Sequence, residues 1–211
     1  MKFLFSHIVV YILSVFVAFG AGAQTTQLML DREFAKATRA FASKDYVTAA
    51  QIFKELSEQD DFNSQYNYAL LLQKGVGTPK DLKQALYWAW RARINGLDPA
   101  IELTTDIAEL LSNKELEEAQ SKLLKALMDD AKSGSPAAIS GVAKTYFYVK
   151  ENPDHEDGYT WALVAQAFGQ NDVLPIIKDA EKTLGLDAQL SCQKEASEVF
   201  LSILQSDNKA N

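Results

Sequence analysis

An internal repeat constrains the fold of this chain more than any other feature of its 211 residues. Small, polar and aromatic residues recur 73 or 74 positions apart, in the pairs Ala69 and Ala143, Trp88 and Trp161, Ala92 and Ala165, Gly96 and Gly169, Ala119 and Cys192, Gln120 and Gln193, and Leu127 and Phe200. Self-similarity over such a period is typical of stacked supersecondary units. Because alanine lets two helix backbones approach closely, the pattern predicts the same helix crossings in both copies.

The hydrophobic period inside the copies is that of an α-helix. Phe34, Ala37 and Phe41 follow one another at spacings of three and four residues, and the same period resumes after Asp45. No run of alternating β-branched residues bounded by hairpin turns supports a sheet. Each copy therefore divides into two helix pairs of about 36 residues.

Glycines mark the ends of these pairs, and capping residues mark the helix starts. The breaks fall near Gly96, Gly134 and Gly169. Side-chain acceptors that open a helix are expected at Thr78-Pro79, Asp98-Pro99 and Ser135-Pro136, in the Ser112 and Glu115 capping box, and at Asp172 and Asp187. These signals predict an all-α fold, an α-solenoid of about five antiparallel helix pairs.

The first 23 residues have the pattern of a secretory signal peptide. Lys2 precedes an apolar stretch from Ile8 to Phe19, and Ala21-Gly22-Ala23 supplies the small-x-small pattern that predicts cleavage before Gln24. The apolar stretch is shorter than the roughly 20 residues that span a bilayer, and no cysteine follows it to carry a lipid. We expect an exported protein, periplasmic or secreted, with no membrane insertion after cleavage; the alternative is an uncleaved anchor.

Composition limits the chemistry of the chain. Its 28 Asp and Glu against 21 Lys and Arg give a net charge of -7, which disfavours nucleic acid and anionic membranes as partners. One of its two histidines, His7, falls in the signal peptide, and Cys192 is the single cysteine. Internal disulfides are therefore excluded, a Cys/His zinc site is disfavoured, and we expect no metal and no cofactor.

The most specific pattern lies at residues 65–100, QYNYALLLQKGVGTPKDLKQALYWAWRARINGLDPA. Its elements are Tyr68-Ala69, Gly75-x-Gly77, Asp81, Ala85-x-x-Trp88, Ala92 and Gly96. This pattern resembles the Sel1-like repeat, a relative of the tetratricopeptide repeat. A weaker copy spans 134–169, with Val149 and Glu151 in place of the loop glycines and Gly158 in place of an alanine. The resemblance implies helix pairs held together by a buried aromatic, here Trp88 and Trp161, around a groove that binds proteins or peptides.

The expected organisation follows from these signals. A signal peptide occupies 1–23, a Sel1-like repeat domain 24–206 and a disordered tail 207–211. Repeats are expected at about 27–59, 60–96, 97–133, 134–169 and 170–205.

The inner wall of such a superhelix is formed by the first helix of each pair, so its outward side chains are the candidate binding residues. On the helix that begins near Asn63, we expect Tyr68, Ala69 and Leu72 in the core. The residues expected in the groove are Tyr66, Asn67, Leu70 and Gln73, with Lys144 and Phe147 in the second copy. A neighbouring helix could instead cover them. Trp90 either anchors a partner or packs beside Arg93.

Three other features receive structural interpretations. Gly75 and Gly77 permit positive φ in a tight connection, and the pattern lacks the further residues of a phosphate-binding loop. His155 lies in an acidic interhelical segment whose spacing does not match an EF-hand or a catalytic triad. Cys192 aligns with Ala119, which predicts a small buried packing residue rather than a reactive thiol.

These observations favour a non-enzymatic, exported repeat scaffold that mediates protein-protein or protein-peptide interaction in the cell envelope. One alternative is a module that binds cell-wall glycans or another small ligand, with Trp90 and Tyr66 stacking on sugar rings. A third is an envelope hydrolase that uses paired carboxylates.

Overall fold

The computed structural model describes residues 27–150 and 152–210, with the backbone alone for 207–210. Within these ranges the chain forms helices joined by turns and contains no β-strand, which confirms the predicted all-α fold. The predicted signal peptide and the cleavage site before Gln24 lie outside the described residues. None of the described helices combines the length and apolar composition needed to cross a bilayer.

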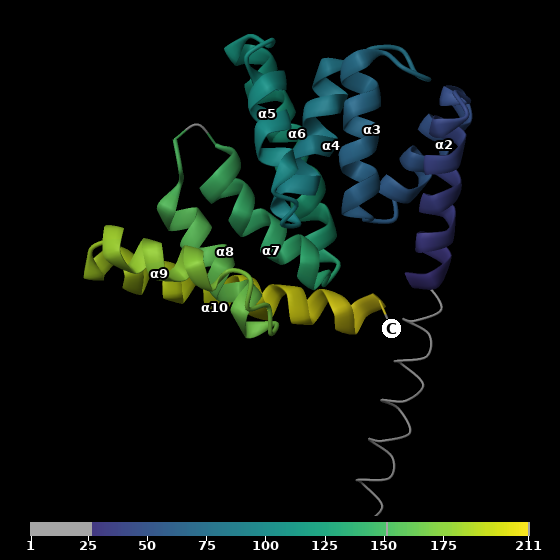
Figure 1. Cartoon of the computed structure of the whole chain (residues 1–211). Helices are drawn as coiled ribbons and strands as arrows, with labels where there is room; N and C mark the ends of the chain where they lie inside the picture. Colours follow the sequence, from purple (N-terminus) through teal and green to yellow (C-terminus); the bar gives the residue numbers. More distant parts are fainter. Residues whose placement is uncertain (1–26, 151, 211) are drawn as a thin grey trace, which may run out of the picture. The chain divides into compact units, whose positions relative to one another are not determined.

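The helices belong to two compact units, which divide between Lys80 and Asp81. In the first unit, residues 27–42 are helical and are followed by α2 (Tyr46–Ser57) and α3 (Phe62–Lys74). The second unit (Figure 1) contains α4 (Leu82–Ile94), α5 (Pro99–Ala108), α6 (Asn113–Lys132), α7 (Pro136–Lys144), a π-helical turn (Thr145–Val149), α8 (His155–Ala167), α9 (Leu174–Thr183) and α10 (Leu186–Ala210). Among the described residues, two α-helices begin within each of the five predicted segments, the π-helical turn also falls in 134–169, and α10 continues past 205.

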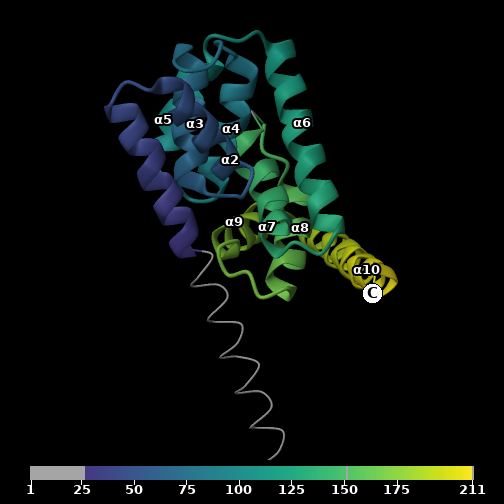
Figure 2. The ribbon, with the colours of Figure 1, turned by 90° about the vertical axis from the view of Figure 1, so that its right-hand side faces the viewer.

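Helices of the second unit pack against the next helix in the chain or the one after it, which is consistent with an α-solenoid. Helix α4 packs on α5 and α6, α6 on α7, α7 on α8, and α8 on α9 and α10. Helix α10 departs from this order because it also reaches α6, where Ser206 Oγ donates a hydrogen bond to the Lys132 carbonyl at 2.8 Å. Figure 2 shows α10 at this end of α6.

The alanines of the repeat are buried in both units. The aligned pair Ala92 and Ala165 is fully buried, as is the pair Ala69 and Ala143. Since a larger side chain would hold the helix backbones apart, this burial explains why alanine recurs at these positions. Trp88 is buried as expected, with 9% of its surface exposed, whereas its counterpart Trp161 stays partly exposed.

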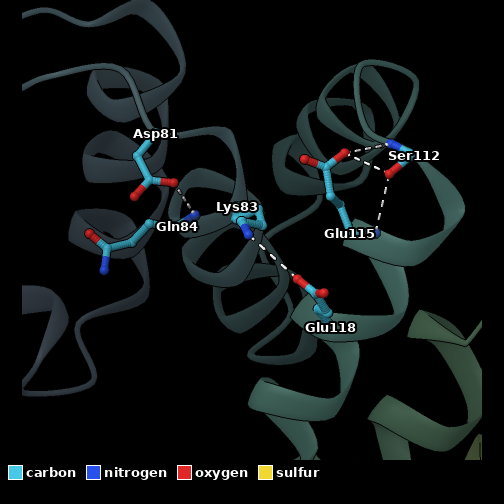
Figure 3. A network of polar contacts seen from close by, with 6 residues as sticks. All are labelled: Asp81, Lys83, Gln84, Ser112, Glu115 and Glu118. Carbon is cyan, nitrogen blue, oxygen red and sulfur yellow. Dashed lines mark hydrogen bonds and ion pairs between the residues drawn. The ribbon is translucent and has the colours of Figure 1, made fainter.

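Helix α6 begins with the capping box that the sequence predicts (Figure 3). The Glu115 carboxylate accepts hydrogen bonds from the Ser112 backbone N–H at 2.9 Å and from the Ser112 hydroxyl at 2.7 Å. These bonds lower the pKa of Glu115, because they favour its ionised form. Close by, Lys83 Nζ lies 3.5 Å from the Glu118 carboxylate and joins the surfaces of α4 and α6.

The predicted start of α4 at Thr78-Pro79 is wrong. The helix begins at Leu82, after Asp81 Oδ1 accepts a hydrogen bond from the Gln84 backbone N–H at 3.0 Å (Figure 3). The helix does not begin earlier, because Asp81 has an extended backbone with φ -144° and ψ 99° and serves as the N-cap.

The other predicted caps have mixed outcomes. Ser135 caps α7 by accepting a hydrogen bond from the Ala138 N–H at 3.3 Å. Asp98 precedes α5 but makes no side-chain capping bond, because its backbone is already helical, with φ -53° and ψ -43°. Asp172 does not cap α9, because its carboxylate is held by Lys144 and Ser140.

Two segments expected to be irregular are helical. Helix α10 continues to Ala210, into the segment 207–211 that was predicted to be a disordered tail. No glycine or proline follows Gly185, so the sequence contains no residue that would end the helix earlier. The acidic segment around His155 forms the first turn of α8, where Asp154 accepts a hydrogen bond from the Asp157 N–H at 3.2 Å.

Candidate functional site

An apolar groove, called here the N-terminal groove, crosses the first unit. It encloses about 300 Å³, and its lining residues are Phe34, Thr38 and Phe41 from the helix at 27–42, Phe53 from α2, Asn67, Leu70, Leu71 and Lys74 from α3, and Val76 from the next turn. The Phe34 and Phe53 rings meet edge to face with their centroids 5.5 Å apart. Phe53 is 4% exposed and Phe41 is 45% exposed, so the groove has a buried aromatic floor and an accessible aromatic edge.

Helical periodicity places these side chains on the groove-facing sides of two helices. In the helix at 27–42, Phe34, Thr38 and Phe41 are spaced by four and three residues and therefore share a face. On α3, Asn67, Leu70 and Lys74 share a face for the same reason. The opposite side of α3 carries Tyr68, Ala69 and Leu72, which are 4%, 0% and 2% exposed. Their predicted place in the core is confirmed.

The four groove residues predicted on α3 therefore have different positions. Asn67 and Leu70 line the N-terminal groove, whereas Tyr66 and Gln73 are partly buried beside it and are not among its lining residues. The Asn67 amide donates a hydrogen bond to the Asn63 carbonyl at 2.8 Å. This amide N–H is thus tied to its own helix, and Leu70 and the more deeply buried Leu71 are the apolar contacts that α3 presents to the groove.

A tight turn fixes the end of the groove. Gly75 ends α3 in the left-handed conformation, and Gly77, which also has positive φ, lies directly against the backbone of Tyr46. A Cβ atom at Gly77 would overlap the Tyr46 carbonyl oxygen. The absence of a side chain therefore lets the turn approach the start of α2, and this places Val76 in the groove wall.

The burial of Trp90 contradicts the hypothesis that this residue anchors a partner. Trp90 is 4% exposed, because it lies within the second unit on the inner face of α4, and it lines a polar cavity beside Arg93. The burial also removes the surface on which Trp90 could stack a sugar ring.

Lys144 has a structural role rather than a place in a binding groove. Its ammonium donates hydrogen bonds to the Ile94 carbonyl at 2.7 Å and to the Asp172 carboxylate at 2.6 Å, and the side chain is 14% exposed. Ser140 Oγ donates to the same carboxylate at 2.9 Å. Burial raises the pKa of Asp172, but Lys144 and Ser140 outweigh this effect, so that the pKa lies below its ordinary value.

Phe147 lies on the π-helical turn, where it packs within its own unit. Its ring meets the His155 ring edge to face at 5.0 Å, and a Cβ at Gly158 would lie 3.1 Å from Phe147 Cδ2. His155 Nδ1 is buried and has no hydrogen-bond partner among the described residues. The tight contact explains why the second copy has glycine where the repeat pattern has alanine.

The thiol of Cys192 is poorly suited to act as a nucleophile. Cys192 is buried, and burial raises the pKa of its thiol, which leaves little thiolate near neutral pH. Among residues 27–150 and 152–206, no group of three or more His, Cys, Asp or Glu side chains could hold a metal ion.

Sequence reasoning missed part of the groove. From Phe34 and Phe41 the sequence predicts only a helical period. It predicts no binding role for Phe53, Lys74 or Val76. The period of Phe34 and Phe41 does mark an apolar face, but periodicity cannot tell whether a neighbouring helix covers that face. Only the contacts of the folded unit leave Phe41 accessible.

Comparisons with known proteins add little to this geometry. No family model matches the chain, and no curated protein matches it. One similar solved structure is the crystal structure of c5321, described as a protective antigen of uropathogenic Escherichia coli strains that displays an SLR fold. It is 18% identical with a TM-score of 0.33, and the match covers 77% of this chain but 43% of that one. The fold assignment therefore rests on the helices described above.

Proposed function

We propose that the chain is an exported, Sel1-like helical-repeat scaffold without enzymatic activity, and that it binds an apolar peptide segment of a partner protein in the N-terminal groove. The observation that carries this proposal is the accessible aromatic edge over a buried aromatic floor, formed by Phe41 and Phe53. Such pockets accept the few side chains that dominate the affinity of a protein interface.

The size of the groove limits its ligand. A volume of about 300 Å³ accommodates one or two large apolar side chains, and not a folded domain. We therefore expect a short helical or extended segment that inserts one or two apolar anchors between Phe34, Phe41 and Leu70. Thr38, Asn67 and Lys74 supply polar groups at the same groove, where they can contact the backbone of that segment.

Charge favours the first unit as the binding region for such a segment. Residues 27–80 contain seven basic and seven acidic side chains, whereas residues 81–211 contain 13 basic and 21 acidic ones. The acidic excess thus falls on the second unit, and Lys74 is the one charged residue that lines the N-terminal groove. A partner segment with an acidic residue beside its apolar anchors would meet complementary charge here.

Export is proposed from the amino-terminal sequence. The charged residue Lys2, the apolar stretch from Ile8 to Phe19 and the small residues before Gln24 support it. Amino-terminal sequencing of the protein from its native cell tests this step, and a chain that retains Met1 in the cytoplasm would contradict it.

Site-specific photocrosslinking tests the groove. A photoreactive amino acid at Leu70, in cells of the native host, should give discrete, protease-sensitive adducts with a partner protein. The matched position is Val47, an apolar residue on α2 that is 68% exposed and does not line the groove. Adducts at Leu70 should disappear in the Phe41→Ala variant and persist in Val47→Ala. Equal adducts from both positions, or adducts unaffected by Phe41→Ala, would contradict the proposal.

A further inference from the structure

A second cavity, called here the Arg93 cavity, lies within the second unit between α4, α5, α6 and the π-helical turn. It encloses about 330 Å³, near the lower end of small-molecule sites. Its inner wall holds Trp90, which is 4% exposed, and Thr104, which is 2% exposed. Thr105, Asn113 and Glu117 are exposed and form the rim. The cavity is therefore aromatic inside and polar at its mouth.

The Arg93 guanidinium has no charged partner among the residues that the structure describes. Its one hydrogen bond among the described residues runs from Nη1 to Thr104 Oγ1 at 3.5 Å, which is long for such a bond. No carboxylate in the described part of the chain lies within ion-pair distance of it. Burial lowers the pKa of Arg93, because the charged form loses hydration without compensation. A bound anion would supply that compensation.

The remaining charge in the Arg93 cavity limits the type of anion. Glu117 lines the same cavity, and its carboxylate has no hydrogen bond or ion pair within the described residues. A negative group at the mouth disfavours a dianion such as phosphate, since a single guanidinium would have to offset both. The planar fork of Arg93 matches a carboxylate, and Glu117 matches an ammonium group.

We propose that the Arg93 cavity binds a small zwitterion, a free amino acid or a short peptide. The carboxylate of this ligand is held by Arg93, its ammonium group lies toward Glu117, and its apolar part packs on Trp90. Asn113 and Gln120 offer amide groups to the ligand, although the Gln120 amide also donates to the Val149 carbonyl at 3.2 Å. This site is independent of the N-terminal groove and of the peptide segment proposed there.

Titration calorimetry and tryptophan fluorescence of the full-length chain test the proposal with L-alanine and L-alanyl-L-alanine as probes. We expect saturable binding of at least one probe at up to millimolar concentration. The carboxyl-terminal amide of the bound probe should bind at least tenfold more weakly, because it lacks the charge that Arg93 recognises. Its N-acetyl derivative should also bind more weakly, because it lacks the ammonium group. The unmodified probe that binds more tightly shows whether the cavity takes a free amino acid or a short peptide.

Variants separate the site from general effects. Arg93→Gln should weaken binding at least tenfold, and Glu117→Gln should weaken it less. Lys83→Gln is the matched control, since it removes the same charge from an exposed position on the same helix and should leave binding unchanged. The amide comparison needs no variant and holds if Arg93→Gln unfolds. Absence of binding by both probes, equal affinity of the amide, or equal affinity of folded Arg93→Gln would overturn the proposal.

Discussion

Replacing Gly77 by alanine tests the close approach that shapes the N-terminal groove. Two costs apply in the folded chain. Alanine in the left-handed region costs about 1 to 2 kcal/mol relative to glycine. Its Cβ would also overlap the Tyr46 carbonyl oxygen, and since backbone must then move, overpacking adds roughly 1 to 3 kcal/mol.

The unfolded state offsets part of this cost. Alanine restricts the unfolded chain more than glycine does, which stabilises the variant by about 0.4 to 1 kcal/mol. The net loss for Gly77→Ala is therefore about 1 to 5 kcal/mol, and we expect the upper half of this range because the overlap is with backbone rather than with a flexible side chain.

Gly75→Ala is the matched control from the same turn. Gly75 has a φ of 68°, close to the 71° of Gly77, but a Cβ there would lie 3.2 Å from Lys80 Cβ and would not overlap backbone. The left-handed and unfolded-state contributions nearly cancel between the two variants, so the difference in their free energies of unfolding isolates the Tyr46 overlap. We expect Gly77→Ala to be less stable by about 1 to 3 kcal/mol.

The assay is urea denaturation followed by circular dichroism at 222 nm, with the m-values compared. Tryptophan fluorescence serves as a second probe that reports on residues 81–211, because all three tryptophans lie there. Amide hydrogen exchange should show the loss of protection in α2 and α3. Equal unfolding free energies for Gly75→Ala and Gly77→Ala would refute the close approach of the turn to α2, and with it the positioning of Val76 in the groove.

Three further predictions concern the second unit. Trp88→Ala should lower the free energy of unfolding by roughly 3 to 5 kcal/mol, because a large buried ring is lost; a thermal melt checks this, and an unchanged melting temperature would contradict the role of Trp88 in the stack. The pKa of Asp172 is lowered in the folded state, so its contribution to stability is present above the unfolded pKa of about 3.9 and is lost as the pH falls through the folded value. Asp172→Asn should therefore be less stable than wild type at pH 7, because the variant leaves the Lys144 ammonium without its carboxylate. The free energies of unfolding of the two proteins should converge in acid. Urea denaturation across pH measures these free energies, and a difference that stays constant with pH would refute the prediction. Cys192 should react with a thiol reagent only after unfolding, because the native thiol is buried and its pKa is raised; rapid labelling of the native protein would show that the region opens.

The repeat predicted the helices well because its signals are local. Helix pairs, the Ser112 and Glu115 capping box and the burial of Trp88 follow from residues that are close in sequence or that recur at the repeat spacing. Predictions failed where a distant residue competed for a side chain. Asp172 has the composition of a cap, but Lys144, 28 residues earlier, provides a stronger partner.

The candidate site was predicted only in part for the same reason. The faces of α3 could be assigned from the helical period, which puts Leu70 and Asn67 on the side of the helix that lines the N-terminal groove. Lys144 and Phe147 occupy the matching repeat positions but pack within the second unit, Lys144 against Asp172 and the Ile94 carbonyl and Phe147 against His155. Equal positions in the repeat thus did not lead to equal roles.

The sequence by itself determined an all-helical fold, the spacing of its helix pairs and the alanines at their crossings, since helix propensity, capping and side-chain size act over a few residues. The tertiary structure decided which faces stay accessible. It buried Trp90 beside Arg93, tied Lys144 to Asp172 and left Phe41 at the edge of a groove. Exposure depends on which distant helices pack against a face, and this information is not contained in the local pattern of any single helix.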